Sequence, residues 1–319
     1  DGECADFSAP EGGMNRGFTS IFTLDLATPT LEFEADHIVG NSPLVYASED
    51  VLIVAEPSFA GWWFWGNDDL DESTNLHTFD ISNPGTTSIS GDMTGGDFTK
   101  SGSGQLTLTG TNNFVNGVTV NEGLLRFNHA NAISADDDLT LTGTGSVDIN
   151  DDMVVDVLTG TGTGTIDISG NSLKANSGSV ANVIEGAGTL EKDGAGTLTL
   201  SGTNTYSGTT QLTDGILEVT NNNALGTSAI TANGGTLRGT VDGINLDNNV
   251  TLNSDLTVDQ DTGIGLTLSG ILSGGSGLFK EGDGDLTLSG ANTFTGDAVV
   301  NGGSLALSGG SAIDDTVKV

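Results

Sequence analysis

A long internal repeat restricts the fold of this 319-residue chain more than any other feature of its sequence. Three segments align without gaps: KSGSGQLTLTGTNNF from Lys100, KDGAGTLTLSGTNTY from Lys192 and KEGDGDLTLSGANTF from Lys280. The lysines are 92 and 88 residues apart. Repetition over such a distance is typical of proteins in which similar units stack on one another.

A shorter period inside each repeat indicates what stacks. Leu198 and Leu200 alternate with threonines, which is the two-residue pattern of a strand with one buried face. Nineteen residues later, Leu217 and Val219 alternate in the same way. A step of about 20 residues is one coil of a β-solenoid. We therefore predict a parallel β-solenoid of about ten coils over residues 96–319, with Leu and Val inside, Gly at corners and Thr facing solvent.

The core of the repeat, G-x-G-x-L-T-L-[ST]-G-x-N-x-[FY], resembles the β-strand repeat of bacterial autotransporter passenger domains. The resemblance implies a right-handed β-helix that is extracellular or held at the bacterial cell surface, commonly as the stalk of an adhesin. Such passengers are attached to the outer membrane through a C-terminal barrel that is absent from this sequence. We therefore expect the full polypeptide to continue past Val319.

The first 95 residues have a different composition and form a separate predicted domain. They contain all three Trp and all five Pro of the chain. Runs such as TSIFTLDL (19–26), VLIVAEP (51–57) and TNLHTFDI (74–81) predict short antiparallel strands with tight turns between them. The order YASEDVLIVAEP, WW, TNLHTFDIS resembles bacterial secreted β-propeller proteins. The segment supplies about two blades, whereas a closed propeller needs at least about four.

Charge and composition exclude several classes of function. The net charge is −35, which repels nucleic acid and anionic membrane surfaces. Cys4 is the only cysteine, so no intramolecular disulfide can form. No apolar run reaches the length of a membrane span, and we predict no direct membrane insertion by this segment.

Clustered tryptophans form the most site-like stretch. Trp62, Trp63 and Trp65 lie in GWWFWG, and such rings can stack on sugars or anchor a partner. The alternative is that they pack between blades or cover the first coil of the solenoid. Both interpretations remain open from the sequence.

Two acidic stretches are candidate calcium ligands, because Ca²⁺ is bound by several oxygens from flexible loops. NDDLDE holds Asp68, Asp69 and Asp71, and ADDD holds Asp136, Asp137 and Asp138. Neither stretch fits an EF-hand, so solvated acidic loops are the alternative. We predict at most weak, structural calcium binding and no other cofactor.

Catalytic constellations are missing from the sequence. His37, His77 and His129 are too far apart in sequence for a short-range zinc motif, and no G-x-S-x-G motif occurs. The glycine-rich pieces at 102–105 and 282–285 precede strands instead of helices, which argues against a phosphate loop. We predict no enzyme activity. The repeat lysines are expected to pair with acidic residues across coils, worth about 0–1 kcal/mol each if exposed.

The predicted function is that of a non-catalytic extracellular stalk or fibre subunit, structural or adhesive. The predicted partners are further copies joined end to end, or a cell-surface or glycan ligand. The alternative is a glycan- or ice-binding module that uses the Trp62–Trp65 loop or outward rows of Thr. An ice-binding face needs Thr-x-Thr in register on successive coils, whereas runs such as LTLTGT (106–111) are expected once per long repeat.

Overall fold

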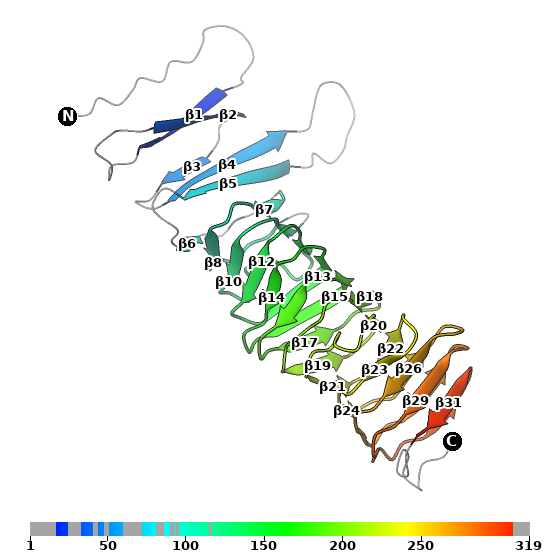
Figure 1. Ribbon diagram of the computed structural model, residues 1–319. Coiled ribbons are helices and arrows are strands. Elements are labelled where there is room, and N and C mark those ends of the chain that lie inside the picture. Colours follow the sequence, from blue (N-terminus) through cyan, green and yellow to red (C-terminus); the bar gives the residue numbers. More distant parts are fainter. Residues whose placement is uncertain are drawn as a thin grey trace, which may run out of the picture.

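The computed structural model describes residues 17–24, 33–40, 44–47, 51–59, 72–80, 86–89, 93, 96–114 and 117–308. All regular elements in these residues are β-strands. The all-β class and the parallel β-solenoid are therefore confirmed. Figure 1 shows the strands stacked rung upon rung along one axis, with β1 to β5 beyond one end of the stack and β31 at the other.

The upstream strands pair in antiparallel fashion, as the sequence predicts. β1 (Gly17–Leu24) pairs with β2 (Phe33–Gly40). β4 (Val51–Phe59) lies between β3 (Leu44–Ala47) and β5 (Glu72–Asp80). The parallel pairing that follows begins with β6.

Eleven strands form one continuous parallel ladder, which we call the first face. Its strands, in spatial and chain order, are β7 (Phe98–Lys100), β9 (Val118–Val120), β11 (Leu139–Leu141), β13 (Met153–Gly160), β15 (Ser172–Val180), β18 (Thr197–Leu200), β20 (Ile216–Val219), β22 (Thr236–Gly239), β25 (Leu256–Asp259), β28 (Leu278–Glu281) and β30 (Ala298–Val300). At about 4.8 Å per rung, this ladder makes a rod on the order of 50 Å long.

A second face shares β13 and β15 with the first, because both strands are long enough to cover two faces. Their N-terminal halves continue into β17 (Thr189–Lys192), β19 (Thr209–Leu212), β21 (Ala229–Ala232), β24 (Val250–Leu252) and β27 (Leu272–Gly274).

The third face is split into two ladders. One contains β6 (Thr86–Ile89), β8 (Gln105–Leu108), β10 (Leu124–Phe127), β12 (Ser146–Ile149), β14 (Thr165–Asp167) and β16 (Val183–Glu185). The other contains β23 (Ile244–Leu246), β26 (Gly265–Leu268), β29 (Asp285–Leu288) and β31 (Ser304–Leu307). Between them, the two coils that contain β18 and β20 have loops in place of a third strand.

The core consists of straight columns of aliphatic side chains. Leu198 stacks directly on Leu217, and Leu217 on Leu237, all fully buried. The predicted 19-residue step is confirmed in the same way where Leu106 meets Leu125. Each leucine is covered by the equivalent residue of the next coil, so no single coil has a core of its own.

At corners where a loop replaces a strand, a buried asparagine side chain forms hydrogen bonds with backbone polar groups. Asn204 is 3% exposed. Its Oδ1 accepts from the backbone N of Ile184 at 2.8 Å, and its Nδ2 donates to the carbonyl of Ala224 at 2.6 Å. These partners lie 20 residues before and after it, so one side chain joins three coils. Asn112 makes the equivalent bonds in the first repeat.

The aromatic residue two positions later fills the same corner from inside. Tyr206 is fully buried. Its hydroxyl lies 2.6 Å from Oγ1 of Thr210, which lies 2.7 Å from Oγ of Ser228. Ser228 in turn donates to the carbonyl of Leu225 at 2.8 Å. This chain of hydroxyls satisfies the phenol inside an otherwise apolar core.

Leu217→Ala tests the stacked column. We expect it to lower the free energy of unfolding by about 2–5 kcal/mol, because a cavity opens between two covered neighbours. Denaturant unfolding followed by circular dichroism measures the change. Thr161→Ala, at an exposed position, is the control and should stay within about 0.5 kcal/mol of wild type. Equal effects at the two positions would contradict a dry shared interior.

Tyr206→Phe tests the buried phenol through pH. Burial raises the pKa of Tyr206 from 10.0 to about 12. Between these values the unfolded chain releases a proton that the folded chain retains, so rising pH lowers the free energy of unfolding by about 1.4 kcal/mol per pH unit. The variant lacks this term. Denaturant titrations of both proteins from about pH 9 to pH 11 measure how much larger the free energy of unfolding is for the wild type. We expect this difference to decrease only above about pH 10. If the difference in unfolding free energy between wild type and Tyr206→Phe does not change with pH, the phenol ionises as readily in the folded chain as in the unfolded chain.

Candidate functional site

The lysine that opens each repeat lies inside the solenoid. Lys192 is fully buried, in a column between Ala175 and Leu212. Its ammonium donates to the carbonyl oxygens of Asp193 at 2.6 Å, Gly194 at 2.7 Å and Asp214 at 3.1 Å. Three backbone acceptors from two successive corners thus surround one charge.

The other two repeats contain the same arrangement. Lys100 donates to the carbonyls of Ser101, Gly102 and Glu122. Lys280 donates to the carbonyls of Glu281, Gly282 and Gly302. The expectation of exposed lysine–carboxylate pairs is therefore wrong: the charges are buried and bind backbone carbonyls.

A glycine 23 residues after the lysine makes room for the ammonium. Gly215 has φ of +66°, and a Cβ there would lie 2.7 Å from Nζ of Lys192 and 2.3 Å from the carbonyl oxygen of Gly194. Gly123 has the same relation to Lys100. Any side chain at these positions would displace the ammonium.

Burial lowers the pKa of Lys192, and the nearby charges of Asp214 and Asp193 only partly oppose this effect. Burial likewise lowers the pKa of Lys100 and of Lys280. The three ammonium groups are thus structural parts of the corners, and their position gives them no access to a ligand.

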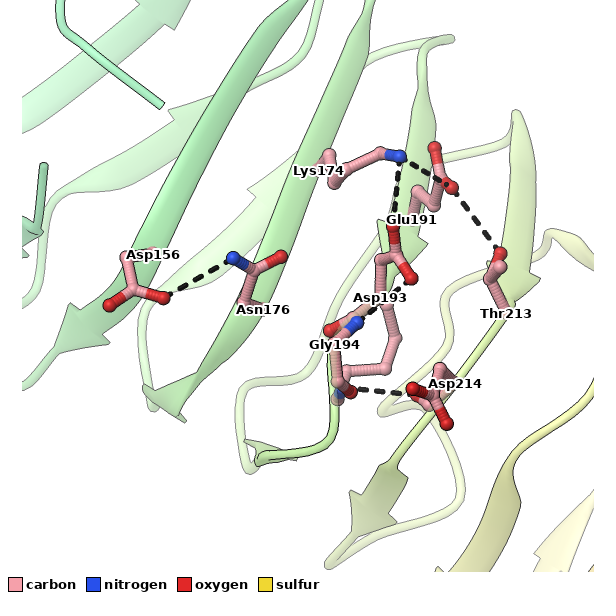
Figure 2. A network of polar contacts seen from close by, with 9 residues as sticks. Asp156, Lys174, Asn176, Glu191, Asp193, Gly194, Thr213 and Asp214 are labelled. Carbon is pink, nitrogen blue, oxygen red and sulfur yellow. Dashed lines mark hydrogen bonds and ion pairs between the residues drawn. The ribbon is translucent and has the colours of Figure 1, made fainter. Parts of the chain in front are cut away.

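Outward charges form ion pairs between rungs. Figure 2 shows Lys174 between Glu191 and Asp193, at 3.0 Å and 3.1 Å. The hydrogen bond from Lys174 to Glu191 is the main cause that raises the pKa of Lys174. The backbone N–H of Gly194, followed by Lys174, lowers the pKa of Asp193. Because these side chains are partly exposed, the pairs contribute little energy and mainly favour one alignment of adjacent coils.

The predicted binding residues divide into two groups. Trp62, Trp63, Trp65, Asp68, Asp69 and Asp71 all lie outside the described residues. Asp136, Asp137 and Asp138 lie within them, in the loop before β11.

In the acidic loop at 136–138, two carboxylates accept hydrogen bonds from backbone N–H groups. Asp137 is buried, and its Oδ2 accepts from the backbone N of Ser134 at 2.9 Å and of Phe114 at 3.3 Å. Burial raises the pKa of Asp137. Oδ1 of Asp138 accepts from the backbone N of Val157 at 3.2 Å. A calcium role for this loop stays a prediction.

Within the described ranges, no group of three or more His, Cys, Asp or Glu side chains is placed to hold a metal ion. The same part of the chain forms no helix that could cross a membrane. Of the three histidines, His129 is half-buried, and its Nδ1 accepts from the backbone N of Asn131.

Outward hydroxyls form a column on the first face. Thr119, Thr140, Thr159, Ser179 and Thr199 occupy equivalent positions on successive rungs. A parallel column two residues further along each strand contains Asn121, Thr142, Thr161, Ala181 and Ser201. Thr-x-Thr pairs thus occur between the long repeats on two successive rungs, Thr140/Thr142 and Thr159/Thr161, but they do not continue on every coil of these columns.

A groove of about 410 Å³ opens on the third face. Its lining comes from three successive coils and consists of Thr203, Thr220, Asn221, Asn222, Asn223, Val241, Asp242, Gly243 and Ile244. Sequence analysis did not identify it. The signal in the sequence is the run TNNN at 220–223, where the strand pattern of neighbouring coils is interrupted.

Lys192→Met tests the buried ammonium. It leaves three carbonyl groups without a donor, and we expect a loss of about 2–4 kcal/mol in the free energy of unfolding. Lys174→Met, which removes a partly exposed lysine of the neighbouring rung, should cost about 0–1 kcal/mol. Denaturant unfolding of both variants measures the difference. A smaller loss at Lys192 than at Lys174 would contradict the role of the carbonyl cage.

Comparison with known families matches both parts of the chain. The passenger-associated-transport-repeat family matches residues 98–127, 190–219 and 278–307. Each match begins within two residues of a repeat lysine and ends with the second leucine-rich strand. The β-propeller domain family matches residues 2–95. No solved structure matches the chain.

Among curated proteins, the chain is similar to the adhesin BmaC autotransporter of Brucella suis biovar 1 (strain 1330). The two are 39% identical over 163 residues, which is 47% of this chain and 5% of that protein. The chain thus spans a small part of its relative's length. The matched repeats and this similarity relate the solenoid to the passenger segments of autotransporters, and they indicate a segment exposed at the bacterial surface or secreted.

Proposed function

We propose that this chain is a non-catalytic adhesive segment that also serves as a rigid spacer. The observation that carries the proposal is the eleven-rung ladder of the first face, uninterrupted from β7 to β30. Continuous backbone hydrogen bonding and a stacked aliphatic core resist bending, which suits a rod that presents ligand-binding surfaces away from the cell. The similarity to an autotransporter adhesin supports the adhesive part.

The groups with shifted pKa values also support a structural rather than a catalytic role. In the described residues, the shifted pKa values belong to structural groups: the buried lysines, Tyr206, Asp137 and the interstrand ion pairs. These groups hold corners or align rungs.

End-to-end self-association stays a prediction. The core columns end at β30 and β31 within the described residues. Val300 is 39% and Leu307 49% exposed there, although Leu288, the neighbour of Leu307 on the preceding rung, is fully buried.

Adhesion is tested with beads coated with the whole 319-residue chain. We expect them to adhere to cultured mammalian cells or to immobilised extracellular matrix more than beads coated with albumin. Beads coated with the Leu217→Ala variant serve as the matched control at a temperature at which the variant is unfolded and the wild type is folded. The variant has the same net charge as the wild type but lacks the folded solenoid. Adhesion no stronger than that of albumin would contradict the proposal.

A further inference from the structure

The third face is interrupted at one place, and the groove lies there. Its first ladder ends at β16, and its second begins at β23. The two intervening coils have loops at 201–208 and 220–228 where their neighbours have strands. These loops leave the depression of about 410 Å³ between them. Its volume lies within the range of about 300–1,000 Å³ for small-ligand sites, and the depression is open to solvent, so it suits an extended ligand that lies along the surface.

Hydrogen bonds fix the walls of this groove. Nδ2 of Asn221 donates to the carbonyl of Ser201 at 3.0 Å, and its Oδ1 accepts from the backbone N of Asn223 at 2.9 Å. Oδ1 of Asn222 accepts from the backbone N of Asn245, and Oδ1 of Asp242 accepts from the backbone N of Gly265, both at 2.9 Å. These bonds hold the side chains of Asn221, Asn222 and Asp242 in place before any ligand arrives, which reduces the entropic cost of binding there.

Several polar groups in the groove have no partner in the described structure. They are the Nδ2 group of Asn222, the side-chain amide of Asn223 and the hydroxyls of Thr203 and Thr220. Amides and hydroxyls can both donate and accept, as the hydroxyl groups of a sugar do. These groups come from the loops of two successive coils, 201–208 and 220–228, and match a ligand that offers hydroxyls at several points.

An apolar side chain completes the surface. Val241 is 50% exposed, and it borders the groove. It offers an apolar surface against which the C–H groups of a pyranose ring can pack.

Charge favours a neutral ligand. Asp242 is the one ionisable residue of the lining, in a chain with a net charge of −35. The column Thr142, Thr161, Ala181, Ser201 continues to Thr220 at the groove, because the backbone N of Thr220 donates to the carbonyl of Leu200. An uncharged surface thus extends from the groove along the rod.

We propose that the groove between β16 and β23 binds a neutral oligosaccharide, with Asn222, Asn223, Thr203 and Thr220 as hydrogen-bonding residues and Val241 as the apolar contact. This inference rests on the proposed adhesive function and names a ligand class for it.

The test uses the whole chain and a panel of soluble polysaccharides in affinity electrophoresis, followed by calorimetry with fragments of any that bind. The panel contains neutral probes (dextran, mannan, galactomannan, xyloglucan) and anionic probes (alginate, hyaluronan). Val241→Asp and Asn223→Ala change the lining without touching the core. Ile271→Asp is the matched control, since Ile271 is also exposed (43%) and lies outside the groove lining.

We expect binding to at least one neutral probe, weakened about 5- to 10-fold or more by each groove variant and unchanged by Ile271→Asp. Binding to no neutral probe, binding to anionic probes alone, or equal binding by the groove variants would each overturn the proposal. Bead adhesion measured in parallel separates the two claims. Beads that adhere equally with wild type and Val241→Asp would leave the adhesive function intact and exclude the groove as its site.

Discussion

Direct stacking of equivalent residues, about 4.8 Å apart from coil to coil, is the constraint on which the rest of this structure depends. Leu198, Leu217 and Leu237 occupy one column because their strands pair in parallel without a change of register. A coil alone would expose both edges of its apolar interior, so each exists only as part of the stack. Corners are the weak points, since the backbone turns there inside a dry environment. Lys192, Asn204 and Tyr206 each satisfy polar groups at such a point.

The strand columns could be predicted from the sequence, because alternation and a fixed step define inward positions. The role of the repeat lysine could not. Lysine is almost never fully buried unless paired, and the three carbonyls that bind Lys192 come from Asp193, Gly194 and Asp214, on two corners that meet only in the folded coil. The groove was missed for a similar reason. It is produced by the absence of a strand in two coils, and TNNN at 220–223 looks like an ordinary loop until the neighbouring rungs are known.

The spacing of the repeats has a consequence for the surface. Lys100 and Lys280 lie on the first face, in β7 and β28, whereas Lys192 lies on the second face, in β17. The 92 and 88 residues between them therefore do not make whole numbers of coils. Successive repeats place their asparagine–aromatic corners on different sides of the rod. The same stabilising corners thus recur inside the rod along its axis, while the outer surface differs from repeat to repeat.

This separation explains how a repetitive chain can carry a local site. Inward positions must match their neighbours above and below, so substitutions there alter several coils at once. Outward positions face water and are free to differ, which allows ion pairs such as Lys174 with Glu191 in one region and uncharged columns in another. Acidic residues dominate the remaining surface and repel other anions. A neutral ligand meets no such barrier, and on a strongly anionic rod it gains most where amides and hydroxyls are exposed and unpaired.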